Sequence, residues 1–194
     1  MRYCNFHTHA PAEAADTFQI VSAAFLPTEP VPDGVWYSLQ FHPWDLPETF
    51  AGLPEKFTEE AAKAHAIGEI GLDRLRGPDL PVQRQYLDAL LQFASDCGKP
   101  VIFHCVRAFP ELLHAVKPYG KIRKLLHGFQ GNREKAKMLT DAGFLLTSRK
   151  TLYPGGGLET DAANLSIQEV YDSCKVTEEI SVELEDRFFR FLQG

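Results

Sequence analysis

Histidine and acidic side chains stand at or near the ends of short apolar runs in widely separated parts of this chain. The first run leads into Asn5-Phe6-His7-Thr8-His9, and later runs contain or end at Glu69, His104 and His127. Because residues i and i+2 of a β-strand share a face, the two histidines of the first run project together. If the first run is considered alone, the alternative to a metal-binding pair is a His-x-His pair on an exposed surface strand. One metal ion must touch its ligands at about 2.0–2.1 Å, so these segments form a site only if the strand ends converge.

Apolar periodicity predicts strands that alternate with helices. The expected strands are Tyr3–His7, Thr17–Phe25, Val35–Phe41, Ala66–Leu72, Val101–Cys105, Lys124–Gly128 and Phe144–Thr147. The expected helices are Pro54–His65, Pro81–Gly98, Pro110–Val116 and Asn132–Ala142, and two more between Ser166 and Leu192 with Ser166 and Ser181 as N-caps. Such alternation indicates a largely parallel sheet. Because candidate ligands follow strands in both halves of the chain, a closed (β/α) barrel is favoured over an open doubly wound sheet.

The first connections are short for this architecture. Only Ala10–Asp16 lies between the first two expected strands, and only the Pro-rich loop Leu26–Gly34 lies between the second and third. A parallel crossover normally takes a dozen residues or more. The chain of 194 residues suits one domain over residues 1–194. We therefore expect a compact TIM-like (β/α) barrel, either incomplete or distorted here or containing one antiparallel pair.

The composition indicates a globular chain without a broadly basic surface. A formal net charge of −6 argues against a surface built throughout for nucleic acid. A local basic patch is compatible with that charge, and its candidates are Arg74, Arg76, Arg84, Arg107, Arg149 and Lys150. No signal peptide and no long apolar run are visible, and the four cysteines form no Cys-x-x-Cys pair. A cytoplasmic protein with no membrane partner is therefore expected.

The acidic candidates each have a structural alternative. Glu69 lies between two glycines in the apolar stretch Ala66–Leu72, where a carboxylate is costly to bury unless it is paired or binds a metal. A salt bridge to a core arginine is the alternative. Asp73 is interpreted as a cap for the next segment. Asp161 follows Leu158-Glu159-Thr160, and its alternatives are a metal ligand, a helix N-cap and a solvated loop acid.

Two histidines, His104 and His127, end consecutive expected strands. Considered alone, each of them is equally explained as a core histidine that is hydrogen-bonded to the backbone. Their repetition at the ends of two consecutive strands favours a shared site. His42 also follows a strand and is expected to bind a substrate anion or to hydrogen-bond a metal ligand, with packing against Trp44 as the alternative. The remaining two histidines are interpreted as surface or packing residues: His65 and His114.

Together these segments resemble the TatD family of metal-dependent hydrolases, whose members are also described as DNases. The resemblance runs from the N-terminus to about Ala162, and Gly-Glu-Ile-Gly-Leu-Asp is its most specific string. The matching segments are Phe6-His7-Thr8-His9, Phe41-His42-Pro43-Trp44, Gly68-Glu69-Ile70-Gly71-Leu72-Asp73, Ile102-Phe103-His104-Cys105, His127-Gly128-Phe129-Gln130-Gly131 and Glu159-Thr160-Asp161-Ala162.

The resemblance implies a TIM-like barrel of the amidohydrolase type with one or two divalent metal ions. The ions considered are Mg²⁺, Mn²⁺ and Zn²⁺. Histidine ligands favour Zn²⁺ or Mn²⁺ by softness, whereas the resemblance favours Mg²⁺. Carried over to this chain, one ion would be held by His7, His9, Glu69 and Asp161, and the other by Glu69, His104 and His127, with Glu69 bridging.

The resemblance also implies roles in catalysis. Asp161 and Glu69 are the expected catalytic residues, with Asp161 as general base for an attacking water. His42 and Arg107 are the expected substrate-binding residues. Phosphodiester hydrolysis of the deoxyribonuclease kind is the first hypothesis, with nucleic acid or a small molecule as substrate.

One segment departs from the family pattern. Arg149–Gly157 is too short and too rich in glycine for the helix that family members carry before the final acid. A metal-binding but catalytically weak member is therefore the second hypothesis. Hydrolysis of a small ester or amide is the third, and the acidic charge favours small substrates over DNA. The sequence does not determine the oligomeric state.

Overall fold

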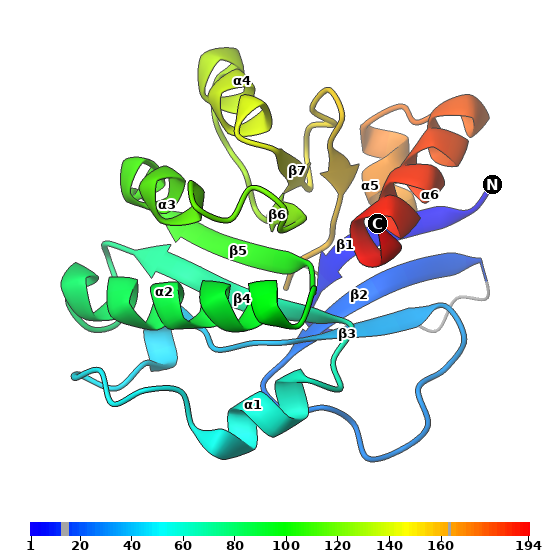
Figure 1. The fold of residues 1–194 in the computed structure, drawn as a ribbon. Helices are drawn as coiled ribbons and strands as arrows, with labels where there is room; N and C mark the ends of the chain where they lie inside the picture. The colour runs from blue at the N-terminus through cyan, green and yellow to red at the C-terminus, as the bar shows by residue number, and fades with distance from the viewer. Residues whose placement is uncertain (13–15, 163) are drawn as a thin grey trace.

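The computed structural model describes residues 1–12, 16–162 and 164–194. Its centre is a sheet of eight strands in which each strand pairs in parallel with the next along the chain (Figure 1). The strands are β1 (Tyr3–Thr8), β2 (Thr17–Ala23), β3 (Val35–Leu39), β4 (Ala66–Asp73), β5 (Val101–Val106), β6 (Lys124–Leu126), β7 (Phe144–Ser148) and β8 (Gly157–Leu158). The parallel strands of the expected barrel are confirmed.

The two short connections near the N-terminus join parallel strands, so the antiparallel alternative is wrong. β1 is only six residues long, which is about 20 Å of strand. The side chain of Gln19 on β2 accepts from the N–H of Ala12 (2.9 Å) and donates to its carbonyl oxygen (2.8 Å).

The last strand, β8, has only two residues, but the chain beyond it completes the contact with β1. Thr8 and Asp161 form a parallel bridge, and the N–H of Asp161 donates to the carbonyl oxygen of His7 at 3.1 Å. The side-chain amide of Asn5 donates to the Thr160 hydroxyl (2.8 Å) and its oxygen accepts from the Thr160 N–H (3.0 Å). These bonds bring the first and last strands together, so the sheet curves into a nearly closed, compact barrel.

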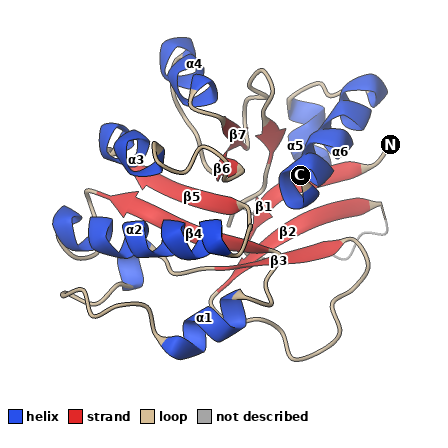
Figure 2. Ribbon diagram, viewed as in Figure 1, coloured by secondary structure: helices blue, strands red, loops and turns tan. Residues whose placement is uncertain are grey.

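Four helices follow β3 to β6 and lie outside the sheet: α1 (Glu55–Ala61), α2 (Leu80–Asp96), α3 (Phe109–Val116) and α4 (Arg133–Asp141) (Figure 2). Their apolar faces form one core with the outward side chains of β4 to β7, including Ile70, Phe103 and Leu126. The alternate residues of the same strands point the other way. Consequently Glu69, His104 and the residue after β6 face the barrel interior.

Two C-terminal helices, α5 (Ile167–Ser173) and α6 (Glu178–Gln193), pack beside β1 (Figure 1). Phe188 of α6 contacts the rings of Phe6, Phe18 and Trp36 with centroids 5.3–6.4 Å apart. No helix in the described ranges is long and apolar enough to cross a bilayer.

The N-cap predicted at Ser166 is confirmed, with a full capping box to Glu169. The N-cap predicted at Ser181 is wrong, because Thr177 caps α6 four residues earlier. The hydroxyl of Ser181 instead donates to the carbonyl oxygen of Arg2 at 2.5 Å, an attachment to the N-terminus that local sequence does not reveal.

Two glycines on either side of Glu69 allow β4 to lie unusually close to β5. Gly68 and Gly71 have φ values of +141° and +152°, a region that residues with a Cβ rarely adopt. A Cβ at Gly71 would overlap the carbonyl oxygen of His104, and one at Gly68 would overlap that of Ile102. The glycines around Glu69 are therefore required by the packing of the two strands that carry candidate site residues.

We expect Gly71→Ala to lower the free energy of unfolding by more than about 2 kcal/mol, because it adds both backbone strain and a clash with β5. Urea denaturation followed by circular dichroism measures this. Gly120→Ala is the matched control, since Gly120 has no positive φ and a Cβ there would meet nothing within 4 Å. Equal midpoints for the two variants would contradict the close approach of β4 and β5.

Candidate metal centre

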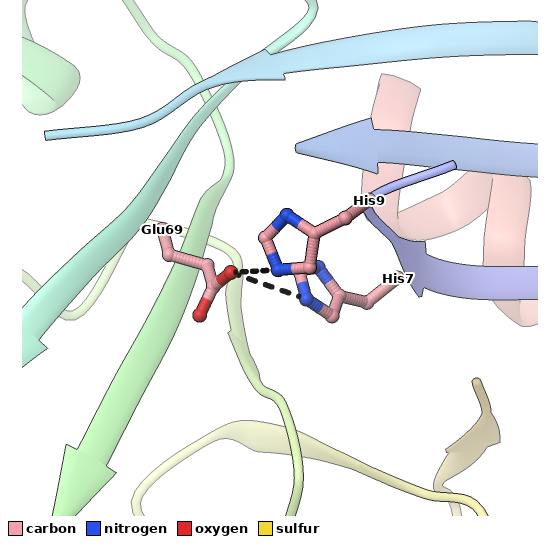
Figure 3. A group of neighbouring side chains, drawn as sticks. All are labelled: His7, His9 and Glu69. Atoms are coloured by element: carbon pink, nitrogen blue, oxygen red, sulfur yellow. Dashed lines mark ion pairs between the residues drawn. The ribbon is translucent and has the colours of Figure 1, made fainter. Parts of the chain in front are cut away.

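The side chain of Glu69 lies at the centre of a group of histidines inside the mouth of the barrel. Its carboxylate is almost fully buried, with 1% exposure. One oxygen, Oε1, is 2.8 Å from Nε2 of His9 and 3.3 Å from Nε2 of His7 (Figure 3). His7 is on β1 and His9 directly follows it, so the i, i+2 spacing places both rings toward the same oxygen. The core arginine that was the alternative partner is not among the ion pairs of Glu69 in the described residues.

The second oxygen of Glu69 faces another pair of histidines. Oε2 is 2.5 Å from Nε2 of His127 and 3.6 Å from Nδ1 of His104. His104 is on β5 and His127 directly follows β6, so both come from the neighbouring strand ends. The rings also approach each other, with His104 Nδ1 3.2 Å from His127 Nε2. Each oxygen of the carboxylate thus has its own histidine pair.

Asp161 reaches the first of these pairs. Its Oδ1 is 3.6 Å from Nε2 of both His7 and His9, and its side chain keeps 28% exposure. The residue has a positive φ of 54° directly after the bridge to β1, and this backbone turn is where the chain leaves the barrel wall. The Gly-rich link before it therefore does not displace the acid from the group.

The charges in this group shift one another's pKa values. Burial lowers the pKa of His7, but the negative charge of Glu69 and bonds to Asp161 and Glu69 outweigh it and raise the pKa to about 10. Burial raises the pKa of Glu69, yet His127 and His7 hold it well below its usual range. The pKa of Asp161 is also lowered by His7 and His127, against burial. The buried carboxylate of Glu69 therefore requires positive charge beside it.

The hydrogen bonds behind the rings indicate which nitrogens are available as ligands. His9 Nδ1 is 3.3 Å from the carbonyl oxygen of Ser22, which can only accept, so this nitrogen carries the proton and Nε2 offers its lone pair. His104 Nε2 is 3.0 Å from Oδ2 of Asp73, so its Nδ1 is the free nitrogen that faces Glu69. In neutral form, both rings present an unprotonated nitrogen to the centre.

His42 has the opposite arrangement. Its Nε2 is 3.6 Å from Glu69 Oε2, but its Nδ1 accepts from the N–H of Trp44 at 3.3 Å. A neutral ring with Nδ1 as acceptor carries its proton on Nε2. His42 is therefore arranged to donate a hydrogen bond into the site rather than to bind a metal. Its ring also packs against Trp44, with centroids 4.6 Å apart, so the packing alternative is present alongside.

Asp73 has a larger part in the site than the expected cap. Its Oδ1 does accept from the N–H of Leu75 (2.8 Å), as a cap would. Its Oδ2 accepts from Nε1 of Trp44 (2.6 Å) and contacts His104, so it orients a ring of the centre. Gln83 of α2 bonds both backbone groups of Asp73. The sequence carried no signal for this contact, because Trp44 and Asp73 are far apart along the chain.

Glu159 is a second acid whose place was missed. Its side chain is fully buried, and burial raises its pKa. Oε1 accepts from the N–H of Gly128 at 2.6 Å, and Oε2 accepts from the hydroxyl of Thr147. Glu159 therefore ties β8 to β7 and to the residue after His127. Its position two residues before Asp161 was visible, but the buried partners were not.

The residues present fit a divalent metal ion. Nε2 of His7 and Oε1 of Glu69 are buried and lack a hydrogen bond of acceptable geometry within the described residues, although they lie 3.3 Å apart. An ion between them would satisfy both atoms. Imidazole and carboxylate are the common ligands of Zn²⁺ and Mn²⁺. Three sets of ligand atoms converge within 4.8 Å: His7, His9 and Glu69; His7, His127 and Asp161; and His42, Glu69 and His104.

Arg107 lies outside this group. It follows β5 and is exposed, with a positive φ of 55°. Together with Phe109 it lines a cavity of about 630 Å³ that reaches the metal centre at His127. His65 and His114 are exposed and lie away from the centre, in line with their interpretation as surface residues.

Comparison with known proteins identifies the family of this chain. The model of the family described as TatD related DNase matches residues 14–167. The 3'-5' ssDNA/RNA exonuclease TatD of Pectobacterium atrosepticum is 30% identical over 128 residues, which are 63% of this chain and 49% of that protein. The uncharacterized metal-dependent hydrolase YjjV of Escherichia coli K12 is 31% identical over 152 residues, 74% of this chain and 57% of that protein. The chain thus spans about half the length of the curated relatives it matches.

Solved structures share the fold. The crystal structure of YjjV, a TatD homolog from Escherichia coli K12, superposes with a TM-score of 0.72 at 19% identity, covering 100% of this chain and 98% of the other. A hydrolase TatD family protein from Entamoeba histolytica gives a TM-score of 0.60 at 16% identity, covering 77% and 65%. Since the family model covers most of the sequence, from before β2 to the start of α5, the chain belongs to the TatD-related DNase family.

Proposed function

We propose that this protein is a metal-dependent hydrolase that cleaves phosphodiester bonds in single-stranded nucleic acid. The observation that carries the proposal is the placement of Glu69, whose two oxygens face two separate histidine pairs. A carboxylate in this position is suited to bridge two ions. Family membership and the names of the relatives, which include ssDNA/RNA exonucleases, support the substrate class.

We assign the ligands in two sets that share Glu69. One or two divalent ions held there would supply positive charge and Lewis acidity for attack on a phosphoryl group. Histidine nitrogens are softer ligands than oxygen and therefore favour Zn²⁺ or Mn²⁺. Mg²⁺, which prefers oxygen ligands, is the alternative. The first set is His7, His9, Glu69 and Asp161, and the second is Glu69, His104 and His127.

The other residues act on the water and the substrate. Asp161 keeps solvent access and a lowered pKa, so its carboxylate is ionised and able to accept the proton of an attacking water. His42 carries a proton on Nε2 beside Glu69 and donates it in a hydrogen bond to a phosphoryl oxygen. Arg107 offers positive charge at the neighbouring cavity.

We expect the purified protein to contain a divalent metal and to hydrolyse both a single-stranded oligonucleotide and bis(4-nitrophenyl) phosphate in at least one of Mg²⁺, Mn²⁺ and Zn²⁺. Metal analysis and initial rates in each ion provide the measurement. 4-Nitrophenyl acetate is assayed in parallel. Bound metal without turnover of any substrate would identify a metal-binding protein instead, and hydrolysis of the acetate alone would identify a small-ester hydrolase.

We expect Glu69→Gln to weaken metal binding more than about 100-fold, because a neutral amide is a poor bridging ligand and ligand loss exceeds the effect of losing an outer partner. Metal content after dialysis against a buffered metal solution measures this. Glu59→Gln on the exposed face of α1 is the matched control. Unchanged metal content in Glu69→Gln would reduce Glu69 to a member of a structural ion-pair network.

We expect Asp161→Asn to lower kcat by about 10²–10⁴-fold, the range for loss of a general base, with only partial loss of metal. Steady-state kinetics with bis(4-nitrophenyl) phosphate at saturating metal give the value. Asp172→Asn makes the same chemical change at an exposed position of α5. If Asp161→Asn matched the wild-type rate, proton transfer would not involve this acid.

A further inference from the structure

A polar cavity of about 170 Å³ opens directly beside the metal centre. This volume holds several waters and suits a phosphate group rather than a whole nucleotide. One wall comes from the centre itself, with His104, His127 and Asp161. The other comes from the carboxyl end of β7, with Ser148, Arg149 and Lys150. The cavity therefore joins the site of the proposed reaction to two cationic residues.

The loop that carries these cations is held in place. Residues 149–156 connect β7 to β8 without a helix. The hydroxyl of Tyr153 donates to the carbonyl oxygen of Gly131 at 3.1 Å, and its ring packs edge-on against Phe129 at 4.9 Å. At the start of the loop, the N–H of Lys150 donates to the hydroxyl of Ser148 at 3.3 Å. These contacts fix the loop over the cavity.

The two cations lack acidic partners, although the chain is acidic overall. Within the described part of the chain, no carboxylate oxygen lies in an ion pair with Arg149 or Lys150, whereas six other basic residues are paired: Arg2, Arg74, Arg84, Lys137, Arg187 and Arg190. The two acids of the cavity have other partners. Glu159 bonds Gly128 and Thr147, and Asp161 faces the first histidine pair. Arg149 and Lys150 are thus free to bind an anion.

The polar cavity continues into the larger one described above. The two share residues at the end of β5 and residues after β6, among them His127, Gly128 and Gln130. The larger cavity adds the side chains of Phe109, Arg107 and Lys135. A ring beside cations is the combination that holds a base and its backbone in single-stranded nucleic acids. The two cavities therefore adjoin, and both border the metal centre at His127.

We propose that Arg149 and Lys150 bind the phosphate adjacent to the scissile one in a single-stranded nucleic acid, with the intervening nucleoside in the larger cavity. This assignment rests on the proposed function and adds to it a requirement for a second phosphate. It makes oligonucleotides better substrates than diesters with one phosphate. The short β7–β8 connection acquires a role as a specificity loop.

The test compares wild type with the double variant Arg149→Ala/Lys150→Ala on two substrates. For a single-stranded oligonucleotide we expect KM to rise about tenfold or more, and the slope of log(kcat/KM) against log salt to become shallower by about 0.7 for the lost phosphate contact. For bis(4-nitrophenyl) phosphate, which has one phosphate, both constants should stay within about twofold. Lys117→Ala/Lys121→Ala removes two exposed cations between α3 and β6, at the other end of the barrel, and controls for net charge.

The possible outcomes distinguish failure of the proposed phosphate subsite from failure of the proposed hydrolysis. Intact hydrolysis with unchanged oligonucleotide KM in the Arg149→Ala/Lys150→Ala variant overturns the subsite and leaves the function standing. If wild type hydrolyses neither diester, the proposed function fails, and fluorescence anisotropy with a labelled oligonucleotide then decides the subsite. Equal oligonucleotide affinity of wild type and the Arg149→Ala/Lys150→Ala variant overturns the proposed subsite, and weaker binding by the variant supports it. Equal melting temperatures establish that both proteins are folded.

Discussion

The buried carboxylate of Glu69 is the constraint on which the rest of this structure depends. Removing an ionised carboxylate from water costs several kcal/mol unless opposite charge and hydrogen bonds replace the lost hydration. Here the replacement comes from five histidines on or after strands β1, β3, β5 and β6: His7 and His9 lie beside one carboxylate oxygen, and His42, His104 and His127 lie beside the other. The barrel has to bring these strand ends together for Glu69 to be buried at all. The proposed ions would perform the same neutralisation more completely, so the buried charge and the proposed catalytic centre coincide.

Closure of the barrel determines whether the last acid reaches that centre. With only two residues in β8, the wall would be open there if pairing ended at Leu158. Instead the following residues bond to β1, through the Asn5 side chain and the bridge from Thr8 to Asp161. The backbone contact that closes the sheet is therefore the same one that positions a candidate ligand. Backbone and side-chain hydrogen bonds to β1 thus hold the acid in place although β8 has only two residues.

The hydrogen bonds behind the rings of His104 and His42 distinguish the two histidines. His104 and His42 both lie near the same oxygen of Glu69, yet Asp73 accepts from one ring and the Trp44 backbone donates to the other. The first ring is left with a lone pair toward the centre and the second with a proton. One hydrogen bond behind each ring thus gives the two histidines different proposed roles, metal binding for His104 and substrate contact for His42.

The sequence alone was sufficient for seven of the eight strands, for the barrel, and for the convergence of His7, His9, Glu69, His104 and His127, because periodicity and strand-end position are local properties. The two-residue strand β8 was not predicted. His7 and His9 share a face through their spacing, and Glu69 between glycines in an apolar run required a charged partner. Other features depended on contacts between distant segments. The parallel pairing of β1 with β2, the cap of α6 at Thr177 rather than Ser181, and the bond from Trp44 to Asp73 were settled by tertiary packing. The position of Asp161 beside the histidines was also settled by tertiary packing. A Gly-rich link allows many paths, and only closure of the barrel against β1 selects one.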